Sequence, residues 1–343
     1  MRLAALLVGS ALLLLVGCRR DVDVPPSTSG ERIDGPFALE LPPGFPPLPE
    51  HGGVPLTNAS VQLGRALFFD PRLSRDGTIA CASCHFPDRA FSDTVPISRG
   101  IDGRTGMRNS PPLTNLAWHP AYFRDGGVPT LEQQAIAPIH DPVEMDFNVQ
   151  LVAELLADKE PYASLSELAY GERLSAFHLV RSLASYQRTL ISGWSRYDRY
   201  LQGDPAALSQ AERRGSELFN SPALGCGTCH SGHDLSDHRF HNIGLYTLSP
   251  DPGRARISLD PLDHGKFKTP TLRNIALTAP YMHDGTLRTL EEVVDHFARG
   301  GQAAPNKSPL VAGFTITDQE RSDLVAFLKA LTDERPIDQV DLP

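Results

Sequence analysis

Apolar residues recur at helical spacing in three parts of this 343-residue chain. Residues 57–69 place apolar side chains on one face behind a Thr or Asn cap, and residues 149–190 hold the longest helical pattern. Near the end, Thr317 and Glu320 form a capping box ahead of a last helix. No convincing run alternates as a strand does, so the pattern predicts a mainly α fold.

The remaining segments predict where the domains divide. Residues 86–147 have little helical periodicity and many Pro, Gly and Asn residues, which is typical of ordered loops and short helices. Turn-forming residues from Gly193 to Pro205 mark a boundary. We therefore expect an N-terminal domain over 51–200 and a C-terminal domain over 205–335.

An internal repeat links the two domains. Residues 111–132 align without gaps on 270–291, and a weaker echo relates Gly64 to Gly215. Self-similarity at this scale indicates repetition of one structural unit. Two fused cytochrome-c-like domains are the simplest interpretation of this repeat together with the cysteine motifs described below.

The first 50 residues indicate export. An early Arg and an apolar run of about 14 residues predict a signal peptide over 1–17 rather than a spanning helix. Leu15 to Cys18 resembles a bacterial lipobox; the alternative is an ordinary cleaved signal that contains a Cys. Residues 18–50 are rich in Pro, Gly, Ser and charge, so we expect a lipidated tether. The predicted location is the periplasm of a Gram-negative bacterium, with membrane anchoring through a lipid on Cys18.

The overall charge bears on the kind of partner that the protein binds. The formal net charge of −9 argues against a nucleic-acid partner and suits docking to a basic protein, although a solvated acidic surface is the commoner reason for such a charge.

The sequence Cys-x-x-Cys-His occurs twice and carries the clearest chemistry. In the attachment motif of a c-type haem, two thiols bond to one porphyrin and the next His ligates the iron. A redox pair, half of a zinc site and a disulfide are the alternatives. Two copies, each followed by His, favour two covalently bound haem c groups. The residues are Cys81, Cys84 and His85 in the first copy and Cys226, Cys229 and His230 in the second.

Together with four further motifs, these two motifs make residues 55–335 resemble the bacterial di-haem cytochrome c peroxidase and MauG family. The resemblance implies that the N-terminal haem is the peroxide site and that the C-terminal haem passes or stores electrons. It also implies a calcium ion between the two haems. The further motifs are Arg108 to Pro111, Thr130 to Gln134, Pro142 to Met145 and Pro280 to Gly285.

The resemblance also implies site residues. The family's distal Gln and Glu fall on Gln134 and Glu144, and Pro138 matches a proline of the same pocket. Splitting the O–O bond of peroxide needs an acid/base that moves a proton between the two oxygens, which a carboxylate can do. The resemblance assigns the calcium ion to Asn109 and to the backbone carbonyls of Thr278 and Pro280.

Two departures from the family concern the first haem and the path between the haems. Where the peroxidases carry a blocking His there is Ile101, which cannot ligate iron, so we expect an open or water-bound first haem. Where they carry a relay Trp there is Arg124, which cannot be oxidised reversibly. Trp118 is a possible substitute, but a buried structural Trp is the more common case. An ion pair with a haem propionate is an alternative role for Arg124.

A third departure concerns the second haem. The family's distal Met or Tyr aligns with Phe297, which has no donor atom. His296 and Met282 are the candidates to replace it, and a second haem without a protein ligand remains an alternative.

Three functions follow from this sequence. The leading one is a peroxidase that reduces hydrogen peroxide with electrons from a small cytochrome c or cupredoxin. The second is MauG-like oxidation of a side chain on a partner protein, which Ile101 favours. The third is a membrane-tethered electron carrier without catalysis, which Gln134 and Glu144 disfavour. The family also tends to form homodimers.

Overall fold

The structure is a computed structural model that describes residues 35–49, 56–338 and 340. The predicted signal peptide and Cys18 lie outside these residues. The fold is mainly helical, as predicted, and its two strands are two residues long and antiparallel. The elements are α1 (Asn58–Phe68), α2 (Leu131–His140), α3 (Val149–Leu156), α4 (Tyr162–Tyr170), α5 (Ala176–Arg188), α6 (Arg196–Leu201), α7 (Gln210–Asn220), α8 (Cys226–Cys229), β1 (Phe240–His241), α9 (Ala255–Ser258), β2 (Phe267–Lys268), α10 (Leu290–Ala298) and α11 (Asp318–Lys329).

The predicted helix caps are present. Thr57 forms a capping box with Ser60 at α1, and Thr317 forms one with Glu320 at α11. Each cap satisfies backbone N–H groups that the first helical turn leaves without partners. Helix starts could therefore be read from local chemistry alone.

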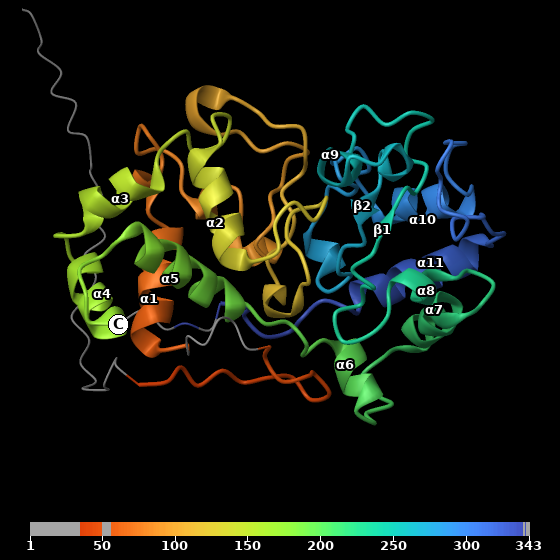
Figure 1. Ribbon diagram of the computed structural model, residues 1–343. Coiled ribbons are helices and arrows are strands. Elements are labelled where there is room, and N and C mark those ends of the chain that lie inside the picture. The colour runs from red at the N-terminus through yellow and green to blue at the C-terminus, as the bar shows by residue number, and fades with distance from the viewer. Residues whose placement is uncertain (1–34, 50–55, 339, 341–343) are drawn as a thin grey trace, which may run out of the picture. The chain divides into compact units, whose positions relative to one another are not determined.

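Two hydrophobic cores organise the described chain. In the first, Phe68 of α1 packs edge-on against Tyr186 of α5, and both are buried. In the second, Phe219 of α7 packs against Phe327 of α11. Helices α1 and α5 lie side by side in the N-terminal half, and α7 and α11 do so in the C-terminal half (Figure 1). The two helix pairs are equivalent under the internal repeat.

A glycine lies at each helix crossing. A Cβ on Gly64 would meet the carbonyl oxygen of Ser182 in α5 at 1.8 Å, and a Cβ on Gly215 would meet that of Asp323 in α11 at 2.0 Å. No side chain fits at these distances because the neighbouring atoms belong to backbone. The sequence echo between Gly64 and Gly215 therefore reflects the same close crossing in both halves.

In each half, an asparagine from the repeat forms a hydrogen bond with the segment that follows the second helix of the pair. The side chain of Asn115 accepts from the N–H of Ser192 at 2.9 Å and donates to its carbonyl at 2.9 Å, just after α5. Asn274 accepts from the N–H of Asp333 at 2.8 Å, just after α11. Both residues adopt the left-handed conformation, with φ of 60° and 59°. Asn tolerates this region better than most residues do, which explains why it occurs at both positions.

The folded unit begins earlier than the predicted domain start at residue 51. Phe37 donates its N–H to the carbonyl of Leu56 and packs on the first core. Phe45 packs edge-on against Trp118, with ring centroids 5.3 Å apart. Residues 35–49, which the sequence analysis assigned to the tether, thus belong to the packed structure. Their Pro and Gly content resembles that of a linker, but the aromatic side chains of Phe37 and Phe45 pack against the folded protein.

The last described segment, which holds Ile337 and Asp338, returns to the first half. Asp338 accepts from Arg65 of α1 and from the Tyr186 hydroxyl, both at 3.0 Å, and Ile337 packs in the first core. Within the described residues, every helix is too short or too polar to cross a lipid bilayer.

The two glycine crossings predict a stability defect. Gly64→Ala and Gly215→Ala should each lower the free energy of unfolding by about 1–3 kcal/mol, because the added methyl group forces two helices apart. Urea unfolding of the haem-loaded protein, followed by far-UV circular dichroism, measures the change. Gly106→Ala is the control, because a Cβ there meets no atom within 4 Å. Equal midpoints for all three variants would contradict the role of the crossings.

Candidate active site

Each Cys-x-x-Cys-His motif forms a tight turn. Cys81–Ser83 is a 3-10 turn that leads into Cys84 and His85, and Cys226–Cys229 is the short helix α8 that leads into His230. None of these four thiols is in a disulfide. They are therefore available for thioether bonds to porphyrin.

Both motif histidines are oriented by a backbone carbonyl. The Nδ1 of His85 lies 2.7 Å from the carbonyl oxygen of Phe91, and the Nδ1 of His230 lies 3.0 Å from that of Leu235. A carbonyl only accepts, so Nδ1 carries the proton and Nε2 keeps its lone pair. Burial lowers the pKa of both imidazoles, which favours the neutral, ligating form. Two free thiols beside an oriented imidazole fit a covalent haem with a proximal His in each half.

Glu144 lies on a loop that folds back onto α2. The N–H groups of Met145 and Phe147 donate to the carbonyls of Pro138 and Ile139, which anchors the loop to the helix that carries Gln134. Gln134 is half-buried. No hydrogen bond joins the Gln134 and Glu144 side chains among the described residues, and the structure brings their elements together through the backbone contacts of the loop.

The environment of Glu144 suits proton transfer. Burial, together with the nearby Asp141 carboxylate, raises the pKa of Glu144 to about 7. Burial raises the pKa of the Cys81 and Cys84 thiols, and the charge of Glu144 adds to the effect, so its carboxylate lies near the first haem motif. Glu144 as a whole residue is exposed, so the dense packing of atoms around its carboxyl, rather than full enclosure, raises its pKa.

Comparisons with known proteins identify the family of this chain. The family model described as di-haem cytochrome c peroxidase matches residues 58–206, and the cytochrome c model matches residues 212–332. The chain belongs to the di-haem cytochrome c peroxidase and MauG family. The recognition from sequence is therefore confirmed.

Similar proteins extend over most of the chain. The methylamine utilization protein MauG of Methylorubrum extorquens is 42% identical over 84% of this chain and 82% of its own length. The cytochrome c551 peroxidase of Nitrosomonas europaea is 34% identical over 80% of each. The crystal structure of a MauG-like protein associated with microbial copper homeostasis is 36% identical, covers 88% of this chain and 97% of its own, and has a TM-score of 0.84. Membership of this family implies two haem c groups.

Ile101 lies against the Glu144 loop. Its N–H donates to the Glu144 carbonyl at 2.8 Å, and its side chain is fully buried. A Cβ on the preceding Gly100 would meet the Glu144 Cα at 2.7 Å, so the two loops are in tight contact. The residue that replaces the family's blocking His is thus held beside the predicted acid/base, and it offers no donor atom.

Two of the residues assigned to calcium from the resemblance, Asn109 and Thr278, are buried and have hydrogen-bond partners within the protein. Asn109 is buried, and both its oxygens accept hydrogen bonds from Arg124. The amide oxygen that the family offers to the metal is therefore already engaged. Thr278 is buried as well, and its hydroxyl donates to the carbonyl of Ile275.

The candidate ligands of the second haem differ in availability. His296 is buried, and its Nε2 lies 3.1 Å from the Ile243 carbonyl, to which it donates. Only Nδ1 of His296 would remain for a metal. Met282 is half-buried, with a left-handed φ of 77°, and none of the described hydrogen bonds uses its sulfur. Phe297, at the family's ligand position, is also half-buried.

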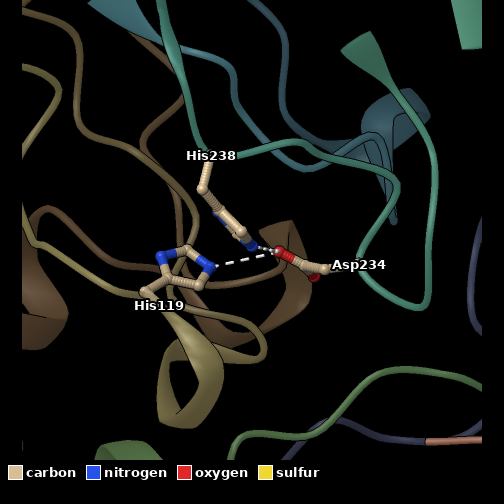
Figure 2. Close-up of side chains that lie close together, drawn as sticks. All are labelled: His119, Asp234 and His238. Atoms are coloured by element: carbon tan, nitrogen blue, oxygen red, sulfur yellow. Dashed lines mark hydrogen bonds and ion pairs between the residues drawn. The ribbon is translucent and has the colours of Figure 1, made fainter. Parts of the chain in front are cut away.

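A histidine–aspartate cluster joins the two halves (Figure 2). Nε2 of His119 and of His238 lie 3.2 Å and 3.6 Å from Oδ2 of Asp234, a spacing that three metal ligands could share. The Lys268 ammonium, however, lies 3.3 Å from Nδ1 of His119. Burial lowers the pKa of Lys268 to about 8, so it stays protonated at neutral pH and can only donate. Nε2 of His119 therefore carries a proton and donates to Asp234, which makes this cluster a hydrogen-bond network.

Sequence reasoning missed this network and the carbonyls that orient the haem histidines. Neither His119 nor Asp234 lies in a recognisable motif. Every residue has a backbone carbonyl, so the sequence does not indicate which carbonyl accepts from a histidine. The one available signal was the repeat itself, which places His119 just after the aligned Asn115 and Ala117.

The pKa of Glu144 can be measured directly. Infrared difference spectroscopy of the haem-loaded protein should show a carboxylic acid that is half protonated near pH 7, and Glu144→Gln should remove its band. Asp141→Asn should move the midpoint down, because it removes a neighbouring negative charge. A midpoint near the ordinary Glu value of about 4.3 would show that Glu144 is solvated.

Proposed function

We propose that this protein reduces hydrogen peroxide to water at the first haem, with electrons that a small donor protein supplies. The observation that carries the proposal is the Glu144 carboxyl, whose pKa is near 7 and which lies beside the first haem motif. The loop of Ile101, a residue with no atom that can ligate iron, lies next to it. The relatives named cytochrome c551 peroxidase support it. The overall change consumes two electrons and two protons and turns hydrogen peroxide into two water molecules.

The chain's own part in this reaction is proton movement and positioning. A haem held by Cys81, Cys84 and His85 would supply an iron able to bind peroxide and to accept electrons. Glu144 takes a proton from one peroxide oxygen and returns it to the other, which leaves as water. A pKa near the working pH suits both directions of transfer. Gln134 is proposed to orient the peroxide with its amide, and Ile101 keeps a protein ligand away from the iron.

Electrons need a route across the junction of the two halves. Arg124 cannot carry them, whereas Trp118 has an oxidisable ring that lies against His233 of the C-terminal half. Its centroid lies 5.5 Å from that of His233, three residues after the second proximal His, and its indole N–H donates to Pro47. We propose Trp118 as part of the route and Met282, rather than His296, as the candidate ligand of the second haem.

The donor and the location are proposed on sequence grounds. An acidic protein with a net charge of −9 suits a basic cytochrome c or cupredoxin as donor. Export to the periplasm, a lipid on Cys18 and a homodimer complete the proposal.

A second candidate function is oxidation of a side chain on a partner protein. The 42% identity to the MauG of Methylorubrum extorquens and the absence of a donor atom at Ile101 favour it. Turnover with peroxide and reduced cytochrome c would support the first function. Loss of peroxide only in the presence of a second protein, with oxidation of that protein, would support the second.

Replacement of the proposed acid/base tests the mechanism. Glu144→Gln should slow peroxide turnover by about 100- to 10,000-fold, because an amide cannot exchange the proton. The wild-type rate should rise with pH through about 7, as the Glu144 base form fills, and the variant should lose this rise. Stopped-flow kinetics measure both. Glu154→Gln, on the exposed face of α3, is the matched control. Wild-type kinetics in the Glu144 variant would rule out this role.

The open first haem predicts a spectrum. The oxidised wild type should show a high-spin haem and should respond to equimolar peroxide without prior reduction. Ile101→His should reduce both signals, because an imidazole would then be available to the iron, whereas Ile101→Leu should retain them. Optical and electron paramagnetic resonance spectra measure the change. An oxidised wild type with only low-spin haem and no response to peroxide would contradict the open site.

A further inference from the structure

Arg124 makes an unusual pair of hydrogen bonds. Its Nε donates to the backbone carbonyl of Asn109 at 2.8 Å, and its Nη2 donates to Oδ1 of the same residue at 2.7 Å. The guanidinium thus clamps one buried asparagine through two neutral oxygens. Oxygen ligands from backbone and amide groups are those that calcium ions select in proteins.

The Asn109 amide is fixed with its oxygen toward Arg124. Its Nδ2 donates to the Val95 carbonyl at 3.2 Å, which leaves Oδ1 for the guanidinium. Its backbone N–H donates to the carbonyl of His283 at 2.8 Å, so Asn109 also holds the loop of the other half. The clamp therefore lies where the loop after residue 278 meets the N-terminal half.

The carboxylates near Arg124 have other partners. Asp125 is fully buried and accepts from Arg108 and Arg256, each at 2.7 Å. Asp251 accepts from Arg108 at 2.6 Å, and Asp284 accepts from the Tyr246 hydroxyl at 2.6 Å.

Arg124 is nevertheless a cation at neutral pH. The guanidinium group of an arginine keeps its proton in proteins, even where it is buried. The site therefore holds one permanent positive charge whose hydrogen bonds go to neutral oxygens.

We propose that the Arg124 guanidinium occupies the place of the calcium ion that the family resemblance predicted at Asn109, and that the protein therefore works without calcium. A calcium ion would need Oδ1 of Asn109 at about 2.3–2.6 Å, but that oxygen already accepts a guanidinium proton. Two cations this close would also repel each other strongly in a buried site. Arg124 thus accounts for two differences from the family. It stands at the position of the relay Trp, and its charge takes the place of the calcium ion.

A cation carried on a side chain behaves differently from a bound ion. It cannot dissociate, so the contact between Asn109 and Arg124 does not depend on the calcium concentration outside the cell. This inference goes beyond the proposed peroxidase activity and does not depend on it.

Calcium content tests the proposal directly. The haem-loaded wild type, purified without chelator and exchanged into calcium-free buffer, should contain no calcium above the buffer blank by plasma emission spectrometry. Calorimetric titration with calcium chloride should show no stoichiometric binding, and an excess of EGTA should leave the spectra of both haems unchanged. One tightly held calcium ion per wild-type chain would overturn the proposal.

Variants show whether Arg124 is the reason. Arg124→Ala frees both oxygens of Asn109 and should bind one calcium ion per chain, with haem spectra that then respond to EGTA. Arg124→Lys keeps the positive charge and should bind none. Arg173→Ala, which removes an exposed arginine paired with Asp158, is the control and should also bind none.

The remaining outcomes also decide the question. A folded Arg124→Ala protein, with intact circular dichroism and both haems, that binds no calcium would overturn the replacement. If that variant fails to fold, the wild-type calcium content and the Arg124→Lys titration still decide. Loss of peroxidase activity has no bearing on these measurements, so the two proposals fail independently.

Discussion

The hydrogen bond from each proximal histidine to a backbone carbonyl is the constraint on which the rest of the site depends. It fixes the imidazole tautomer and directs Nε2 toward the iron position. The carbonyls belong to Phe91 and Leu235, whose φ values of 58° and 49° lie in the left-handed region. Such a conformation costs a non-glycine residue about 1–3 kcal/mol. Both halves accept this cost at the same place, because the turn must bring a carbonyl back to a histidine only five or six residues earlier.

What the sequence could and could not predict follows from the same physics. The caps at Thr57 and Thr317, the haem motifs and the repeat rest on local residue chemistry, so they could be read directly. The left-handed turns at Phe91 and Leu235 could not, because neither position carries Gly or Asn. The contact between Arg124 and Asn109 spans fifteen residues and joins two positions that the family resemblance assigned to separate roles.

The start of the folded unit was misplaced for a related reason. Composition averages over a segment, and residues 35–49 have the Pro and Gly content of a linker. Two aromatic rings outweigh that average. Phe37 is anchored on the first core, whereas Phe45 lies under the guanidinium of Arg273, 5.0 Å from its centre, and against Trp118. Even the partial burial of single large side chains removes apolar surface from water, and this decides whether such a segment packs.

The two halves diverge mainly where they meet. Their helix crossings and the hydrogen bonds of Asn115 and Asn274 are alike, because packing allows few alternatives at those positions. The repeated Asp-Gly turn is different. A Cβ on Gly126 would meet Phe240 of the C-terminal half at 2.5 Å, and a Cβ on Gly285 would meet Pro96 of the N-terminal half at 2.5 Å. Each turn thus presses against the opposite half, so its neighbours are no longer related by the repeat. Asp125 binds arginines there, whereas Asp284 binds a tyrosine. Divergence at this junction gives the two copies of one unit different electrostatic surroundings, although their folds are alike.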